Sequence, residues 1–151
     1  MLKQVIRAQS QDAEIISPLF DEYRQFYGYP SEPELALSFI SQRLKRDESV
    51  IFYLPDEQNQ ALGFVQLYPG FSSLRAAQLL ILNDIYVTQH ARCVGIGRAL
   101  LDAALNYAKA QGIDELILET QRNNVRAQAL YESIGFVRDN EFFHYSLTLK
   151  P

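Results

Sequence analysis

The stretch that decides the fold is Arg92-Cys93-Val94-Gly95-Ile96-Gly97-Arg98, which follows a strand-like apolar run ending at Val87 and opens a helical segment ending before Gly112. Glycines let the backbone approach a ligand closely. The first turn of a helix presents unpaired N–H groups and a partial positive charge. The junction therefore predicts a site for an anion such as a pyrophosphate.

Two common phosphate loops do not fit this stretch. A Walker A loop needs a lysine and a hydroxyl after its last glycine, whereas Gly97 is followed by Arg98-Ala99. A dinucleotide fingerprint needs a third small residue at a set spacing in the first strand–helix turn, whereas Leu100 occupies that place late in the chain. Neither nucleotide hydrolysis nor dinucleotide binding is favoured.

The composition predicts one folded domain over residues 1–151, since 48% of the residues are hydrophobic and 21% are charged. The net charge of −4 argues against nucleic-acid binding and mildly favours cationic partners. No apolar run approaches a membrane span and no signal segment opens the chain, so we expect a cytoplasmic protein without membrane contact. A single cysteine, Cys93, and two histidines predict neither a disulfide nor a metal site.

Hydrophobic spacing and turn residues predict a mixed α/β (α+β) order of elements. Glycine and proline clusters separate the segments, and the first two long strands are expected to pair antiparallel. The expected helices cover residues 13–26, 33–46, 96–111 and 124–134. The expected strands cover residues 5–7, 50–54, 61–68, 76–87 and 115–120, with a closing hairpin of 136–138 and 142–149.

Three separated signatures then occur in the order that one superfamily uses them. They are Arg92-x-x-Gly95-x-Gly97 after a strand, Asn124-x-x-Ala127-x-x-Leu130-Tyr131-Glu132, and Gly135-Phe136. The chain resembles the GNAT superfamily of acyl-CoA-dependent N-acyltransferases, closely over roughly residues 80–137. The resemblance implies a mixed central sheet of about seven strands with an antiparallel N-terminal half, splayed fourth and fifth strands and about four helices.

The resemblance also implies where acetyl-CoA, the co-substrate, would bind. The pyrophosphate would lie on the loop, and the pantetheine would pair with the strand before it like an added strand. Asn124 and Tyr131 would face the thioester end, and Ala127 is a further cofactor-binding residue that the resemblance implies. The cofactor-binding residues implied in the strand and the loop are Ile85, Tyr86, Val87, Arg92, Cys93, Val94, Gly95, Ile96, Gly97, Arg98 and Ala99.

The chemistry requires a base and an acid. An alkylammonium has a pKa of about 10.4, so the acceptor must lose a proton, and a tyrosine with a pKa of about 10 can protonate the departing thiolate. Tyr131 is the candidate acid. Asn83-Asp84 is similar to a Glu-Asp pair of polyamine and diamine acetyltransferases, but an amide cannot accept a proton. Asp84, directly or through water, and Glu119 are the candidate bases.

The acceptor is predicted with less detail. In the superfamily the first two helices and the final hairpin line the acceptor side, so Tyr23, Tyr27, Tyr29, Glu32 and Glu34 are candidates for binding a cation, together with Asn83 and Asp84. We expect direct acetyl transfer to a small primary amine, polyamine-like or lysine-like, and the resemblance implies that a homodimer can form. A protein lysine or N-terminal acetyltransferase, and a non-catalytic acyl-CoA-binding module, are the alternatives.

Overall fold

The computed structural model describes residues 4–150, and the chain divides into two compact units that are treated separately, one ending at Glu119 and the other beginning at Thr120. The first unit contains β1 (Ile6–Arg7), α1 (Ala13–Phe26), α2 (Pro33–Lys45), β2 (Val50–Pro55), β3 (Ala61–Ser72), β4 (Ala77–Val87), α3 (Ile96–Ala110) and β5 (Leu116–Leu118). The second unit contains α4 (Val125–Ile134). All four predicted helices are confirmed.

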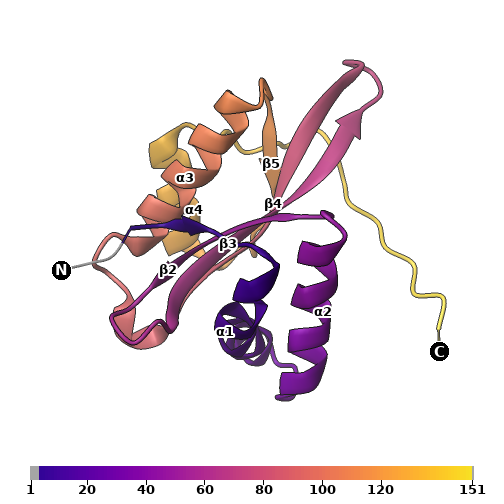
Figure 1. Cartoon of the computed structure of the whole chain (residues 1–151). Helices are drawn as coiled ribbons and strands as arrows, with labels where there is room; N and C mark the ends of the chain where they lie inside the picture. Colours follow the sequence, from indigo (N-terminus) through magenta and orange to yellow (C-terminus); the bar gives the residue numbers. More distant parts are fainter. Residues whose placement is uncertain (1–3, 151) are drawn as a thin grey trace. The chain divides into compact units, whose positions relative to one another are not determined.

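The strands of the first unit form one mixed sheet in the order β1-β2-β3-β4-β5 (Figure 1). Neighbours from β1 to β4 pair antiparallel: α1 and α2 lie in the connection from β1 to β2, whereas short turns join β2 to β3 and β3 to β4. The pair β4–β5 is parallel, because α3 carries the chain back across the sheet before β5 begins. The predicted antiparallel N-terminal half is therefore confirmed.

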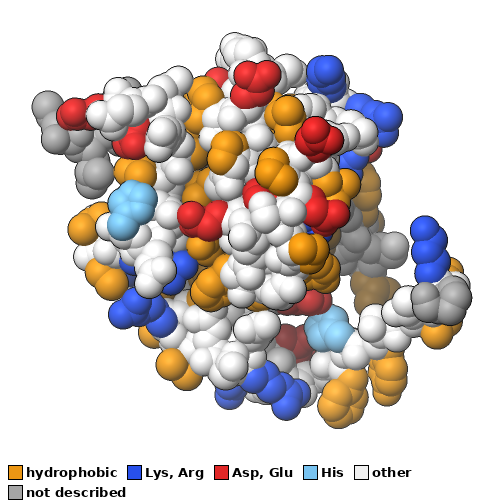
Figure 2. All heavy atoms as spheres, turned by 90° about the horizontal axis from the view of Figure 1, so that it is seen from below, with side chains coloured by type: hydrophobic (Ala, Val, Ile, Leu, Met, Phe, Trp, Pro, Cys, Tyr) orange, Lys and Arg blue, Asp and Glu red, His pale blue; other side chains and the backbone are white. Residues whose placement is uncertain are grey.

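Helices cover both faces of this sheet. α1 and α2 lie on one face, where Ile16, Phe20 and Ile40 pack against Phe64 of β3. α3 covers the other face, and its buried residues include Leu100 and Leu101. Seen from below, the surface over α1 and α2 carries acidic side chains among hydrophobic ones (Figure 2). Apolar side chains from three helices thus hold β3 and β4 at the centre of the layers.

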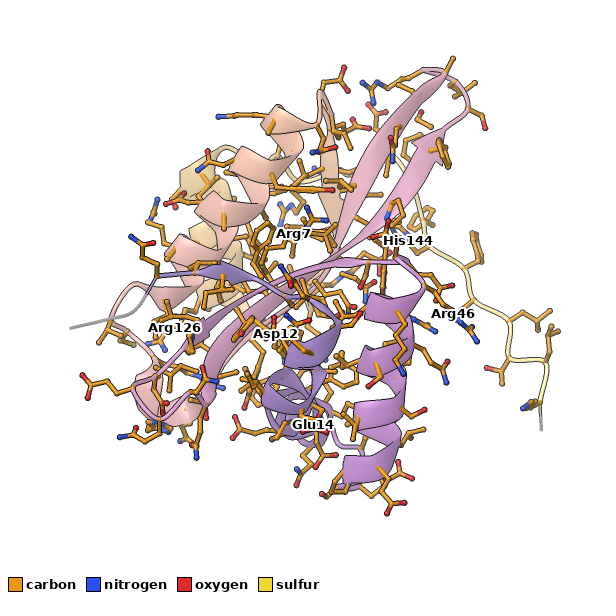
Figure 3. The ribbon with its side chains drawn as sticks, viewed as in Figure 1. Arg7, Asp12, Glu14, Arg46, Arg126 and His144 are labelled. Atoms are coloured by element: carbon orange, nitrogen blue, oxygen red, sulfur yellow. The ribbon has the colours of Figure 1, made fainter. Side chains whose placement is uncertain are left out.

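Two polar residues near the N-terminus attach the first strand to its neighbours. The Arg7 guanidinium lies over the Tyr107 ring of α3, 4.9 Å from its centroid, in a cation–π contact (Figure 3). The Asp12 carboxylate accepts the Gln9 backbone N–H at 2.8 Å in the turn before α1. The first contact joins β1 to α3, and the second closes the turn that leads into α1.

The prediction of about seven strands is wrong, since the described residues contain five. The segments 136–138 and 142–149, expected as a closing hairpin, are not strands. Their alternating apolar pattern is compatible with a strand, but an isolated two-stranded hairpin is marginal without a third strand or a packing surface. The segment expected at 115–120 is also shorter, because β5 pairs with β4 only from Leu116 to Leu118.

No helix among the described residues is long and apolar enough to cross a membrane.

Candidate active site

A β-bulge in β4 creates the centre of the candidate site. Gln66 of β3 pairs with Asp84, but the next residue, Leu67, pairs with Leu82, so Asn83 is an extra residue in β4. A bulge bends a strand and changes where its side chains point. It places Asp84 opposite Gln66, on the sheet face that α1 and α2 cover.

The Asp84 carboxylate is 7% exposed and accepts hydrogen bonds from three uncharged side chains. Tyr23 Oη donates to Oδ1 and Gln66 Nε2 donates to Oδ2, each at 2.8 Å. Asn83 Nδ2 lies 3.2 Å from both oxygens. Ser49 Oγ in turn donates to Gln66 Oε1 at 2.8 Å, which extends the network into the core.

No ion pair to Asp84 is found among residues 4–150. The charge of Asp84 acts on Tyr68, whose pKa is raised to about 12 by burial and then by the nearby carboxylate, while Arg43 opposes the shift. Tyr68 therefore stays protonated across the physiological range. The second base candidate, Glu119, directly follows β5 and is exposed.

One edge of β4 is open after the bulge. The parallel pairing with β5 ends at Leu82, opposite Leu118, and no described strand pairs with β4 beyond it on that side. The Thr88 N–H donates to the Leu62 carbonyl of β3 at 2.8 Å. Because backbone groups alternate in direction along a strand, those of Ile85 and Val87 point away from β3, toward the open side. The Tyr86 backbone faces β3 instead, where Tyr86 pairs with Phe64.

The loop before α3 has the backbone geometry of an anion site. Cys93 and Gly95 have positive φ angles of 67° and 89°, and such alternation turns successive N–H groups into a concave nest. Gly95 is the N-cap of α3, and the Ala99 N–H donates to its carbonyl at 3.1 Å. The N–H groups of residues 96–98 precede the first bond of the helix, and its first turn contains no acidic residue.

Arg92, the first residue of the loop motif, turns back to the end of β4. Its Nε donates to the Val87 carbonyl at 2.9 Å. Its guanidinium lies 5.4 Å from the ring centroids of both Phe26 and Tyr86. Arg92 thus joins the loop to the end of α1 and to β4, a contact that the motif alone did not indicate.

Glu22 of α1 is a second carboxylate that the sequence reasoning missed. Thr88 Oγ1 donates to its Oε1 at 3.1 Å, while its Oε2 is buried with no hydrogen-bond partner among the described residues. Burial and Glu22 raise the pKa of Tyr86 to about 12, against the opposing influence of Arg92. The sequence gives no sign that Glu22 has a buried carboxylate oxygen, since most glutamates on an amphipathic helix face solvent.

The three tyrosines predicted to line the acceptor side have different surroundings. Tyr23 binds Asp84, and its ring packs edge-on against Tyr27 at 5.2 Å. The Tyr29 ring is covered by the Arg24 guanidinium at 5.2 Å, and Arg24 also pairs with Glu32 at 3.2 Å. Of these three tyrosines, Tyr23 therefore binds Asp84, and Tyr27 packs against Tyr23. Glu34 is exposed in the first turn of α2.

The turn that carries these aromatic residues is held by Asp21, which the sequence reasoning also missed. Asp21 is buried, and its carboxylate accepts the Ser31 hydroxyl at 2.7 Å and the Glu32 backbone N–H at 2.8 Å. Gln25 Nε2 donates to the same carboxylate at 3.2 Å. Asp21 therefore fixes the path of the chain between α1 and α2.

The remaining predicted residues lie on α4 in the second unit. Asn124 is its N-cap, and the side-chain oxygen accepts the Ala127 N–H at 3.2 Å. Tyr131 is 7% exposed, and its ring packs against Phe136 with 5.9 Å between centroids. The Tyr131 carbonyl accepts the N–H groups of Gly135 and Phe136 and so ends the helix. The motif residues Asn124 and Gly135 are therefore the N-cap and the C-cap of one complete helix.

The described residues contain no group of three or more His, Cys, Asp or Glu side chains that could hold a metal ion. They combine a strand edge that is open beyond the β-bulge, a helix start preceded by positive φ angles, and a buried carboxylate on the sheet face that α1 and α2 cover. An open edge and a nest suit a donor with amide and pyrophosphate groups, and the carboxylate suits an amine.

Comparison with known proteins agrees with this arrangement. Residues 16–136 match the family described as Acetyltransferase (GNAT) family. The chain is 43% identical over 143 residues to a Bacillus subtilis (strain 168) protein named "Uncharacterized N-acetyltransferase YhfO", with 95% of each chain covered. A crystal structure of a probable acetyltransferase is 41% identical, with a TM-score of 0.90 and 99% of each chain covered.

The fold also resembles that of a predicted acetyltransferase from Clostridium acetobutylicum whose crystal structure includes acetyl-CoA. The TM-score is 0.77 at 16% identity, with 97% of this chain and 96% of the other covered. At this identity the likeness shows the fold alone, whereas the family match spans most of the sequence. The chain therefore belongs to the GNAT family of acetyltransferases, which use acetyl-CoA, and it is an acyltransferase.

Proposed function

We propose that this acyltransferase transfers the acetyl group of acetyl-CoA to a primary amine on a small cationic molecule, polyamine-like or lysine-like. The observation that carries the acceptor proposal is Asp84, a buried carboxylate that hydrogen-bonds only to uncharged groups. A buried carboxylate without a cation is costly, and an ammonium group offsets that cost. Acidic side chains among hydrophobic ones over α1 and α2 also favour a cation (Figure 2).

The donor is proposed to lie along the end of β4. The backbone groups of Ile85 and Val87 point toward the open side, so the amides of a pantetheine chain can pair with them as an added strand. The positive φ angles at Cys93 and Gly95 and the free start of α3 suit the pyrophosphate. This order along β4 directs the thioester toward the bulge and Asp84.

The proposed reaction is direct attack in a ternary complex. The amine nitrogen bonds to the thioester carbonyl carbon and forms a tetrahedral intermediate, which collapses by breaking the carbon–sulfur bond. The proton of the amine passes to Asp84, directly or through water, with Glu119 as the second candidate. Tyr131 is proposed to protonate the departing thiolate. Asn83, which cannot take the proton, holds the Asp84 carboxylate through its amide.

A screen of amines with acetyl-CoA, read by release of free thiol, tests this function. Polyamines, diamines and lysine are expected to react, whereas aminoglycosides and peptides are expected to react poorly. Preferred acetylation of peptide lysines or N-termini would replace the small-molecule proposal. Ping-pong kinetics with an acetylated enzyme would rule out direct transfer.

Variants of the two carboxylates separate binding from folding. Asp84→Asn is expected to lower kcat/KM by about 10²-fold or more, the usual contribution of a positioned base. Asp102→Asn, at an exposed position of α3, is the matched control and is expected to keep wild-type kinetics. If Asp84→Asn also retained wild-type kinetics, Asp84 would be neither the base nor the amine site. Tyr131→Phe tests the acid in the same assay.

A further inference from the structure

Arg43, in the last turn of α2, carries a guanidinium group that the described residues satisfy only in part. Its side chain is 21% exposed, and its Nε atom lies 3.3 Å from Glu48 Oε1. That Nε atom is buried and makes no hydrogen bond within residues 4–150. The Nη2 atom has one long hydrogen bond, to Gln42 Oε1 at 3.5 Å, and none is found for Nη1 in the same range. Arg43 therefore keeps donors that a ligand can use.

Aromatic packing connects this guanidinium with the proposed amine site. The guanidinium lies over the Phe39 ring, 4.5 Å from its centroid. Phe39 stacks on Phe20 with 5.4 Å between centroids, and Phe20 lies 6.1 Å from the Tyr23 ring. The Tyr23 hydroxyl donates to Asp84. A row of rings thus leads from Arg43 to Asp84 on the sheet face that α1 and α2 cover.

A row of hydrogen bonds makes the same connection. The Arg43 carbonyl accepts the Glu48 N–H at 3.0 Å in the turn after α2. The next residue, Ser49, donates to Gln66, which donates to Asp84. The end of α2 is therefore attached to the network that holds Asp84.

Tyr68 lies near both charged groups. It follows Gln66 by two residues in β3, so the two side chains share one face of the sheet. The extra residue of the bulge is in β4 and does not interrupt this alternation. The Asp84 carboxylate raises the pKa of Tyr68, whereas the Arg43 guanidinium lowers it. One anionic and one cationic group are thus close to the same phenol.

Neither charge neutralises the other directly, since no ion pair between Arg43 and Asp84 is found within the described part of the chain. Glu48 is the charged group found against Arg43 there. It is 46% exposed and pairs with the Nε atom alone. The site therefore offers a buried carboxylate for a cation and the terminal guanidinium nitrogens for an anion.

We propose that the acceptor is an amino acid, whose amine binds at Asp84 and whose carboxylate binds the Arg43 guanidinium. This inference rests on the proposed function, because it takes Asp84 as the amine site. A guanidinium binds a carboxylate through two parallel N–H···O hydrogen bonds. The second ammonium group of a polyamine would meet Arg43 as a like charge, so the site favours a lysine-like over a polyamine-like acceptor.

Lysine, lysinamide and cadaverine test the carboxylate separately from the amine. Lysinamide replaces the carboxylate by a neutral amide, and cadaverine is lysine without it. With saturating acetyl-CoA, kcat/KM for lysine is expected to exceed the other two values by about 10-fold or more, as a hydrogen bond to a charged group allows. Equal values for all three would overturn this inference and leave the proposed function in place. No turnover of any amine would overturn both.

Variants of Arg43 locate the effect. Arg43→Gln is expected to lower kcat/KM for lysine by about 10-fold or more through KM, and to change that for cadaverine by less than about 2-fold. A purely structural loss would lower both values together, so the lysine-to-cadaverine ratio is the deciding measurement. Arg43→Lys keeps the charge but not the paired donors, and it is expected to retain part of the preference.

The matched control is Arg46→Gln, an exposed arginine at the C-terminal end of the same helix (Figure 3). It is expected to keep the wild-type ratio. Calorimetry of lysine binding to the enzyme–CoA complex gives a reading that does not depend on turnover, and Arg43→Gln is expected to weaken binding by about the same 10-fold. An unchanged ratio and unchanged lysine affinity in Arg43→Gln would contradict the assignment of Arg43.

Discussion

Replacing Gln66 by methionine removes the centre of the polar network that holds Asp84. Gln66 is 0% exposed, accepts a hydrogen bond from Ser49 Oγ and donates one to Asp84 Oδ2, each at 2.8 Å. Methionine has a similar length but no N–H donor, and its sulfur is a weak acceptor. The variant therefore loses both hydrogen bonds without a large cavity.

The two losses can be sized separately. A hydrogen bond to a charged group contributes about 1.5–3 kcal/mol, and one between neutral groups contributes about 0.5–1.5 kcal/mol. Their sum is about 2–4.5 kcal/mol, from which the extra buried apolar surface of methionine recovers about 1 kcal/mol. The free energy of unfolding of Gln66→Met is therefore expected to fall by roughly 1–3.5 kcal/mol.

Urea unfolding followed by far-UV circular dichroism measures this loss, since the chain contains no tryptophan. With a urea slope of about 2 kcal/mol per molar, a loss of about 2 kcal/mol lowers the midpoint by roughly 1 M. The matched control is Gln78→Met, at an exposed position of the same strand, β4. Its effect is expected to stay within about 0.5 kcal/mol.

A double-mutant cycle with Ser49→Ala checks that the network is the cause. Ser49→Ala removes the hydroxyl that donates to Gln66, so the second substitution should cost less in the Gln66→Met background. The expected coupling is about 0.5–1.5 kcal/mol. Strict additivity, or a Gln66→Met effect no larger than that of Gln78→Met, would refute the reasoning.

Three further predictions follow from particular contacts. Gly63→Ala places a Cβ atom 3.0 Å from a carbon of Ile96, so we expect a loss of about 1–3 kcal/mol in urea unfolding. Gly95→Ala, at a φ of 89°, should weaken acetyl-CoA binding in calorimetry, and unchanged affinity would contradict the loop assignment. Because the folded-state pKa of Tyr68 is raised to about 12, the stability it contributes is fully present below its unfolded pKa of about 10 and is lost as the pH rises toward 12. Asp84→Asn should lower the pKa of Tyr68, and phenol absorbance with Tyr68→Phe as the reference would show it.

Local patterns correctly predicted the elements that are specified by residues close together in the sequence, above all the helices. The stripe of apolar residues in α1, the proline at the start of α2 and the glycine before α3 are short-range signals, and the helices begin where these signals stand. The loop motif predicted an anion site at the start of α3, and the structure adds that Cys93 and Gly95 in this loop have positive φ angles. The failed C-terminal hairpin shows the limit, since alternation encodes a strand but not its partner.

The network around Asp84 depends on distant parts of the chain. Tyr23 meets Asp84 across 61 residues and Gln66 meets it across 18, and neither pairing leaves a sign in the local sequence. Glu22 and Thr88 are similarly separated by 66 residues. The bulge at Asn83 allows Asp84 to meet Tyr23 and Gln66. One extra residue in β4 changes which face of the sheet the following side chains occupy.

Short-range signals were sufficient to place the four helices and the first five strands, but not the closing hairpin, because backbone preferences and apolar periodicity act within a few residues. The burial of Asp84 among uncharged donors, the end of the β4–β5 pairing at Leu82 and the turn of Arg92 back onto Val87 emerged only from the tertiary structure. Those features arise from register and packing between strands and helices far apart in the chain, where the gain from burial outweighs any local preference.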